Sequence, residues 1–533
     1  MVKTVQTKKL VCGRILAGRQ QSRNGATRSC YARSGALSLG SVLRSVSWGS
    51  SYLVVLMLTI APAVFAETNP AYTLYPISTP EGEIFEASAI EVLDDGRVAV
   101  ALRKGEVWLI DGLYDNDPAT TTFNKIAEAL HEPLNLLQAD GGLYVVQRSE
   151  LTHLEDTDGD DIIDVYRTVN SDWGITGNYH EYAYGAVPSK DGALWITLNI
   201  GMGKANYPKQ DAWRGWGGKV YPDGRFEPMC AGMRSPAGVG ANLEGDVFFT
   251  DQQGNWIPAG SLHQLRKGAF YGHVDSLKHC ALPGAPFAKP ETVPSGIPLP
   301  EAKAQFPMLS LPAVWFPYKK VGMSTTDVRA IENDEQLGPF KGQLLVGDFT
   351  TASISRVYME KVNGEYQGAC FNFLDGFQSA VLRMDWGKDG SLLVGESNRG
   401  WNSYGTKSFG MDRVTWNGEV PFEIQQMRLE ADGFTLRFTK PVKPETATDV
   451  ASYTMSSYTL MYHANYGSPE VDTQAHAVKS ATLSEDGMEV RLVTDPIRQY
   501  YIHEIHAEGV RSNDGMELDH SDGYYTVNEL VKE

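Results

Sequence analysis

Six short stretches of the chain share one pattern, in which a glycine precedes a run that alternates between polar and apolar residues. The copies are Gly96-RVAV, Gly141-GLYV, Gly192-ALWI, Gly245-DVFF, Gly342-QLLV and Gly390-SLLV. Alternation with a period of two predicts a half-buried β-strand, and the glycine predicts a tight turn before it because glycine adopts a positive φ without steric cost. Each copy is therefore expected to be one hairpin of a repeated unit.

The spacing of these copies predicts the architecture. They lie 45, 51, 53, 97 and 48 residues apart, and most of these intervals match one four-stranded propeller blade. The long interval contains a proline-rich stretch at 281–317, and proline removes the donors that a central strand needs. We interpret this stretch as an inserted loop, with a degenerate extra blade as the alternative. An all-β protein is expected, with a six-bladed β-propeller over residues 70–418.

The pattern changes near Pro421. FTLRFTKPV, ATLSEDGMEVRLV, YYIHEIHAEGV and DGYYTVNEL are alternating runs spaced as in a small antiparallel sandwich. Residues 421–533 are therefore expected to form an immunoglobulin-like domain. His503 and His506 lie three apart on one expected strand, so they should face opposite sides and do not suit a shared metal.

Residues 1–66 differ from the rest in charge, with nine Lys or Arg and no acid. They end in the apolar stretch SSYLVVLMLTIAPAVFA, with Val64 and Ala66 at the positions that a signal peptidase reads. The stretch is interrupted by Pro62 and is shorter than the roughly 20 residues that a spanning helix needs. We expect an export signal over 1–66 that is cleaved near Ala66, a periplasmic or secreted protein, and no stable membrane span.

The composition narrows the range of partners. The chain has 533 residues, 42% of them hydrophobic, and 65 acidic against 47 basic residues, nine of which fall in the first 66. This acidic balance argues against nucleic acid, which is bound through clustered Lys and Arg. Cys230, Cys280 and Cys370 follow the signal segment, and an odd number allows one disulfide whose pairing the spacing leaves open.

The sequence lacks the motifs of several enzyme classes. It contains no GxSxG elbow, no phosphate-binding Walker loop, no HExxH and no dinucleotide fingerprint, which argues against a serine esterase of the usual type and a nicotinamide enzyme. It also lacks a CxxCH motif, so no covalently attached haem is expected.

One acidic stretch predicts a metal site. LEDTDGDDIIDVY places Asp156, Asp158, Asp160 and Asp164 at relative positions one, three, five and nine, with the Ile162 carbonyl as a further oxygen ligand. This density of carboxylates suits a hard cation such as calcium. The sixth position holds an aspartate instead of the usual glycine, and an acidic surface turn is the alternative.

Register brings polar residues to one end of the expected propeller. In each hairpin the start of the first strand lies beside the end of the second, so His180 should neighbour Asn199. A neutral imidazole there is able to take a proton from a substrate hydroxyl. A structural hydrogen-bonding histidine is the alternative.

Arginines should gather at the same end. Arg234 is expected near Asp251 and Gln252, and the further arginines at this end are Arg103, Arg148 and Arg399. One interpretation is a pocket that holds an anionic ligand through bidentate arginines. The other is that the arginines pair with Asp251, Asp348 and Glu396. Nearby aromatic residues suit sugar rings; they are Tyr179, Tyr182, Tyr184, Trp256 and Trp401.

The run from His180 through KDGALWITLN, AGMRSPAGVG, DVFFTDQQGN and GAFYGHV resembles the soluble quinoprotein sugar dehydrogenases, six-bladed propellers that use pyrroloquinoline quinone (PQQ) and calcium. A further resemblance, to the dehydrogenase-like propeller module of large secreted proteins of planctomycetes and related bacteria, includes LHEPLNLL, GNYHEYAYG, LGPFKGQLLVGD and YGSPE. It extends over nearly all of the chain after the signal segment.

The resemblance implies roles for individual residues. His180 matches the base that takes the hydroxyl proton, and Arg234 matches the arginine that contacts the cofactor. Asn199 stands where these enzymes keep an aspartate. The lysine and two arginines that neutralise the carboxylates of the quinone fall near Thr350, Ala380 and Leu382, so Arg103, Arg148, Arg234 or Arg399 would have to take their place.

These patterns favour an exported oxidoreductase that oxidises a sugar or related alcohol with PQQ and passes electrons to a separate periplasmic acceptor. Two alternatives remain: a calcium-dependent propeller lyase or hydrolase acting on carbohydrates or lactones, and a non-catalytic propeller that binds glycans or proteins. The lyase or hydrolase needs its calcium at the central mouth, and the binding module is favoured if every central arginine pairs with an acid.

Overall fold

The computed structural model of the protein describes residues 69–114, 120–203 and 211–532. The expected export signal lies outside these ranges. The described residues belong to one compact unit, Phe65–Glu533, and they are all-β with short helical turns. Among them, no helix combines the length and hydropathy that a transmembrane span requires.

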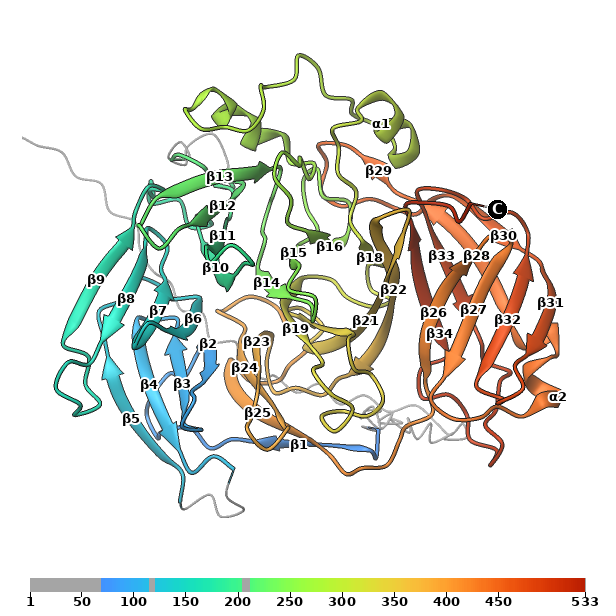
Figure 1. Ribbon diagram of the computed structural model, residues 1–533, viewed down its shortest axis with the longest axis horizontal. Helices are drawn as coiled ribbons and strands as arrows, with labels where there is room; N and C mark the ends of the chain where they lie inside the picture. The colour runs from blue at the N-terminus through green and yellow to red at the C-terminus, as the bar shows by residue number, and fades with distance from the viewer. Residues whose placement is uncertain (1–68, 115–119, 204–210, 533) are drawn as a thin grey trace, which may run out of the picture. The chain divides into compact units, whose positions relative to one another are not determined.

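Six antiparallel sets of four strands follow one another along the chain (Figure 1). The first three are β2 (Ala87–Val92), β3 (Val98–Leu102), β4 (Glu106–Asp111) and β5 (Thr122–Ala127); β6 (Asn135–Ala139), β7 (Gly142–Val146), β8 (Leu151–Glu155) and β9 (Val165–Asn170); and β10 (Ala183–Pro188), β11 (Leu194–Leu198), β12 (Trp216–Val220) and β13 (Phe226–Ala231). The next three are β14 (Gly238–Ala241), β15 (Val247–Asp251), β16 (Gly260–Gln264) and β18 (Val314–Phe316); β19 (Thr325–Ala330), β20 (Leu344–Asp348), β21 (Ser353–Val362) and β22 (Glu365–Leu374); and β23 (Val381–Trp386), β24 (Leu392–Ser397), β25 (Phe409–Trp416) and the N-terminal β1 (Tyr72–Pro76).

The first strands of the six sets contact one another in a closed cycle, in the order β2, β6, β10, β14, β19, β23 and back to β2 (Figure 1). The strand β1 pairs with β25 along its whole length, so the sixth set is completed from the N-terminal end of the described chain. Sheets arranged around a cycle of first strands are characteristic of a β-propeller.

The repeat pattern is confirmed strand by strand. Each of the six glycines precedes the second strand of its set, from β3 to β24. All six adopt a positive φ, between 75° and 99°, as the expected turns require.

The proline-rich stretch is an insertion between the third and fourth strands of one set. It begins at the end of the 3-10 helix η2 (Val274–Ala281), contains β17 (Ile297–Pro298) and α1 (Leu299–Gln305), and ends with β18, which pairs with β16. It forms no extra four-stranded set. The three described cysteines are free thiols, so no disulfide joins any two of Cys230, Cys280 and Cys370.

The C-terminal region contains two sheets that enclose one core. One sheet has the order β26 (Ile424–Glu430), β27 (Gly433–Phe438), β32 (Glu489–Thr494) and β31 (Val478–Leu483). The other has the order β34 (Asp522–Val527), β33 (Tyr501–His506), β28 (Thr454–Thr459) and β30 (Val471–His476). Their shared core includes Phe434, Leu436 and Ile505. The remaining elements are α2 (Pro444–Ala447), η3 (Val450–Ser452) and β29 (Met461–Tyr462).

This region is joined to the rest through two strand pairings. The strand β34 pairs with β22, so four C-terminal strands continue the fifth set as one eight-stranded sheet. The strand β29 pairs with β17 of the insertion. This pairing holds the residues that follow β29 beside the insertion.

Candidate functional site

A cavity of about 500 Å³ opens where the six first strands meet. Each of these strands, or the residue just before it, contributes a lining residue; these are Ser88, Leu134, Tyr184, Ala237, Thr326 and Leu382. Its volume falls in the range of about 300–1,000 Å³ that is usual for small-molecule sites.

The charge of the lining is one-sided. Four arginines line the cavity, Arg103, Arg234, Arg383 and Arg399, together with His180, and no Asp or Glu among the described residues does. The whole chain carries 18 more acidic than basic residues, so the cavity has the opposite charge balance. A positively charged cleft of this kind concentrates anions.

His180 lies in this cavity, with its Nδ1 atom buried and without a hydrogen-bond partner in the described part of the chain. Burial lowers the pKa of the imidazole below its ordinary value of 6.5, and the charges of Arg234, Arg399 and Arg148 lower it further. The ring is therefore neutral at pH 7, which is the form that accepts a proton.

Asn199 neighbours His180, as predicted, but through the backbone. Its Nδ2 atom donates to the carbonyl oxygens of His180 at 2.5 Å and Ile200 at 3.2 Å. It does not partner Nδ1 of the imidazole. The contacts of Asn199 thus hold the backbone that carries His180, and the amide does not occupy the place of a carboxylate beside the ring.

Three of the four arginines that the sequence predicted at this site share one acid, Glu132, which the sequence patterns did not indicate. Glu132 accepts hydrogen bonds from Arg148 at 2.9 Å, Arg399 at 2.9 Å and Arg103 at 3.2 Å. Arg103 also pairs with Glu86 at 2.7 Å. Glu132 follows His131 in the stretch LHEPLNLL, which was the only signal that could have drawn attention to it.

Two arginines of the lining have no carboxylate partner among the described residues. Arg234 has a buried Nε without a partner, and its guanidinium lies over the Tyr466 ring at 5.3 Å. Arg383 donates to the carbonyl oxygens of Leu134 at 2.9 Å and Leu382 at 2.6 Å. Burial lowers the pKa of both arginines, and a guanidinium stays protonated in proteins. Both therefore offer positive charge to a ligand.

The acids at the strand ends bond to the backbone and not to arginine side chains. Asp251 accepts from the amides of Arg234 at 2.8 Å and Ser235 at 2.6 Å. Asp348 accepts from Met323, Ser324, Thr350 and Thr351, and Glu396 accepts from Ser379. The alternative in which the central arginines pair with these acids is wrong, since no such ion pair is present among the described residues, although the charge of Asp251 still acts on Arg234.

The remaining predicted residues divide between the lining and its surroundings. Gln252 lines the cavity and donates to the Thr325 carbonyl oxygen at 3.3 Å. Arg148 lies behind the lining, with its guanidinium 5.1 Å from the Tyr182 ring. Trp256 packs on Tyr462 outside the cavity, whereas the lining includes Tyr179, Tyr182, Tyr184 and Trp401.

The predicted calcium loop connects β8 and β9, away from the cavity lining. One oxygen from each of Asp156, Asp158 and Asp164 lies within 4.8 Å of the others. The Asp160 carboxylate instead accepts from the Ile162 amide at 2.8 Å. The pKa of Asp158 is raised, chiefly by the charges of Asp160 and Asp164, which indicates repulsion that a bound cation would relieve.

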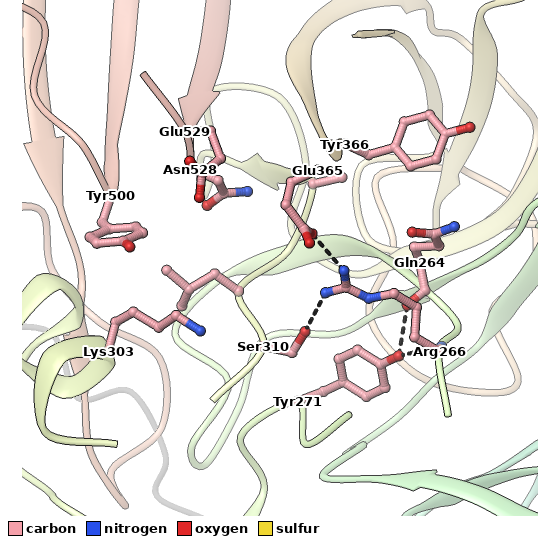
Figure 2. Close-up of a pocket in the computed structure, with 12 residues that line it drawn as sticks. Gln264, Arg266, Tyr271, Lys303, Ser310, Glu365, Tyr366, Tyr500, Asn528 and Glu529 are labelled. Carbon is pink, nitrogen blue, oxygen red and sulfur yellow. Dashed lines mark hydrogen bonds and ion pairs between the residues drawn. The ribbon is translucent and has the colours of Figure 1, made fainter. Parts of the chain in front are cut away.

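A second cavity, of about 160 Å³, lies between the insertion, β22 and the C-terminal region (Figure 2). Its cations are already satisfied by protein. Arg266 bonds Glu365 at 2.5 Å and Ser310 at 3.0 Å (Figure 2). Lys303 donates to the carbonyl oxygens of Pro307 at 3.0 Å and Leu309 at 2.7 Å. These contacts indicate that the second cavity lies at a structural junction between these elements.

Comparisons with known proteins give a partial match. The family model described as "Domain of unknown function (DUF7133)" matches residues 105–276. A search of curated proteins gives no match.

Among solved structures, the chain is similar to a putative oxidoreductase (glucose dehydrogenase) from Thermus thermophilus. The two share 16% identity with a TM-score of 0.47, over 64% of this chain and 99% of the other. It is also similar to the PQQ-bound aldose sugar dehydrogenase from Streptomyces coelicolor, with 12% identity, a TM-score of 0.44 and coverage of 65% and 99%. The soluble aldose sugar dehydrogenase from Escherichia coli shares 14% identity with a TM-score of 0.44, over 65% of this chain and 100% of the other.

Proposed function

We propose that the central cavity is the active site of an exported oxidoreductase, which oxidises a sugar or related alcohol with the quinone cofactor PQQ. The observation that carries this proposal is the lining, in which four arginines and a neutral histidine converge and no acid from the described residues is present. The reaction requires residues that bind an anionic cofactor and a residue that accepts a proton. The lining of this cavity contains both, as arginines and a histidine.

The residues present fit the cofactor, a flat molecule with three carboxylates. Arg234 and Arg383 form no ion pair with an acid among the described residues, so they would bind two of the carboxylates. Arg103 and Arg399, with Arg148 behind the lining, carry three positive charges, which Glu132 and Glu86 balance only in part. Thr350 and Leu382 line the cavity as neutral side chains at the positions where the resembling enzymes carry cations, and Arg383 stands directly beside Leu382.

His180 would act as the base. Its neutral ring accepts the proton of the substrate hydroxyl as the carbon–hydrogen bond breaks, so that the alcohol becomes a carbonyl. When bound, the quinone supplies the acceptor for the hydrogen and the electron pair that leave the carbon. The neighbouring positive charge of Arg234 opposes protonation of the ring, so we expect the proton to pass quickly to solvent.

The proposal extends to the domains, the metal loop and the export of the protein. We infer that the six sets of strands are six propeller blades and that the two C-terminal sheets form an immunoglobulin-like domain. We further propose calcium binding by Asp156, Asp158 and Asp164, because carboxylate oxygens at this spacing suit a hard cation. Export through the basic and apolar segment 1–66 and reoxidation by a separate periplasmic acceptor complete the proposal.

A non-catalytic binding module is the second candidate. It is favoured by Glu132, which already occupies three of the central arginines. The lyase or hydrolase has less support, since it needs calcium at the cavity and none of the described acids spaced for a metal lines it.

The deciding experiment titrates the purified chain with PQQ in the presence of calcium and then follows sugar-dependent reduction of a dye. We expect binding at micromolar cofactor and turnover with an aldose. No binding would refute the quinoprotein proposal, and His180→Ala with unchanged turnover would remove the base. Arg234→Gln should weaken cofactor binding, whereas Arg225→Gln, which removes an arginine outside the cavity, should not.

A further inference from the structure

A segment of the C-terminal region forms part of the central cavity. Residues 463–468, which follow β29, are bonded to the loop after β15. The amide of Trp256 donates to the His463 carbonyl oxygen at 3.1 Å, and the amide of Gly467 donates to that of Gly254 at 3.1 Å. The Asn255 side chain donates to Ala464 at 2.7 Å. Bonds in both directions fix the position of the residue between them, Tyr466.

Tyr466 lines the cavity and covers one of its arginines. The Arg234 guanidinium lies 5.3 Å from the centre of the Tyr466 ring. Arg234 is 8% exposed, whereas Tyr466 is 64% exposed. The ring therefore sits at the rim, with one face toward the arginine and much of its surface open to solvent.

Other exposed aromatic residues gather at the same rim. Seven aromatic side chains are exposed in the described parts of the chain, and five of them line this cavity; these are Tyr179, Tyr318, Trp401, Tyr404 and Tyr466. The other two are Tyr75 and Tyr166. Exposed aromatic surface concentrated at one place marks a site of contact with a ligand, and flat apolar faces beside polar groups suit sugar rings.

The rim residues differ in how they lie relative to His180. The imidazole of His180 contacts Tyr179 at 5.2 Å and Trp401 at 5.7 Å between ring centres, whereas Tyr466 lies over Arg234. A sugar ring at His180 therefore leaves Tyr466 to another part of the ligand. We propose that Tyr466 forms an outer subsite, where its ring stacks on a second sugar ring of an oligosaccharide whose first ring lies at His180. This inference rests on the proposed function. It makes Tyr466 a specificity-determining residue contributed by the C-terminal region.

The experiment measures equilibrium binding of glucose, cellobiose and cellotetraose, and of the matching xylose series, to the full chain. Tyr466→Ala should weaken binding of the longer sugars by about two- to tenfold, the usual worth of one aromatic stacking contact. It should leave binding of the single-ring sugars unchanged. Tyr466→Phe, which keeps the ring, should restore the wild-type order. Tyr75→Ala, which removes an exposed tyrosine outside the cavity, is the matched control.

Two results would overturn the outer subsite. One is an equal loss for sugars of every length together with weaker PQQ binding, which would mean that Tyr466 acts by holding Arg234. The other is wild-type affinity that does not increase with chain length, including no binding at all. A protein that binds longer sugars in this way but never reduces the dye would refute the oxidoreductase and retain the subsite.

Discussion

The shared acid at the centre of the molecule gives the sharpest test of the electrostatic account. Glu132 bonds three arginines, at 2.9 Å to Arg148, 2.9 Å to Arg399 and 3.2 Å to Arg103. Glu132→Gln removes the negative charge and replaces one oxygen with an amide group that only donates. At least one guanidinium would then face a donor, and the three positive charges would lose their common partner.

The cost follows from the burial of these groups. The side chains of Arg148, Arg399 and Glu132 are 9%, 10% and 16% exposed, and removing one partner of a buried pair costs about 3–5 kcal/mol. Each arginine keeps another partner, such as the Tyr182 hydroxyl for Arg399 at 2.9 Å. We therefore expect a loss of about 2–4 kcal/mol in the free energy of unfolding. The cavity also becomes more positive, so PQQ should bind more tightly.

Urea unfolding followed by tryptophan fluorescence measures the first effect and cofactor titration the second. Glu83→Gln is the control, because Glu83 is exposed and its side chain forms no hydrogen bond or ion pair with the described residues. A change below about 0.5 kcal/mol, the range of ordinary surface substitutions, would refute the reasoning. The double variant with Arg399→Gln should lose less than the sum of the two single losses, because the two residues share one interaction.

Three further tests address the base, the arginine and the metal loop. Burial, together with the charges of Arg234 and other nearby arginines, holds the pKa of His180 below 6.5, so the acid limb of kcat/KM should lie below pH 6.5. Arg234→Gln should move this limb to higher pH, and a limb that stays in place contradicts the coupling. Gly254→Ala places a Cβ atom within clashing distance of the Arg234 Nε, so it should displace the guanidinium and weaken PQQ binding, as titration will measure; unchanged affinity would mean that Arg234 is not a cofactor ligand. Calcium should raise the thermal midpoint of the wild type but not of Asp158→Asn, and a wild type indifferent to chelation would remove the calcium site.

Local pattern was sufficient to predict the repeated part of the fold. A turn glycine and an alternating run specify a hairpin without help from distant residues, and all six predicted strands are present, from β3 to β24. The neighbourhood of His180 and Asn199 and that of Arg234 and Asp251 followed from hairpin register alone. In the C-terminal region β27, β31, β32, β33 and β34 were predicted, whereas β26, β28 and β30 were missed because their alternation is weak.

Local sequence patterns could not predict contacts between distant parts of the chain. Glu132 meets Arg399 across 267 positions, and Tyr466 reaches Arg234 from the C-terminal region. The resemblance indicated Leu382, whereas the charged residue that lines the cavity is its neighbour Arg383. Which side chain fills a central cavity depends on how the sets of strands meet, and no local pattern encodes this.

The positive charge of the cavity depends on where the acids point as much as on the arginines. Asp251, Asp348 and Glu396 stand at the ends of second strands, where a carboxylate accepts from the amides that open the first strand. Burial raises the pKa of Asp251 to about 6, and burial together with Asp412 raises that of Glu396 to about 10. Glu396 is therefore uncharged at pH 7. Glu396 therefore leaves the arginine charge intact, and Asp251 acts on Arg234 through space without forming an ion pair, so a strongly acidic chain retains a cavity suited to an anion.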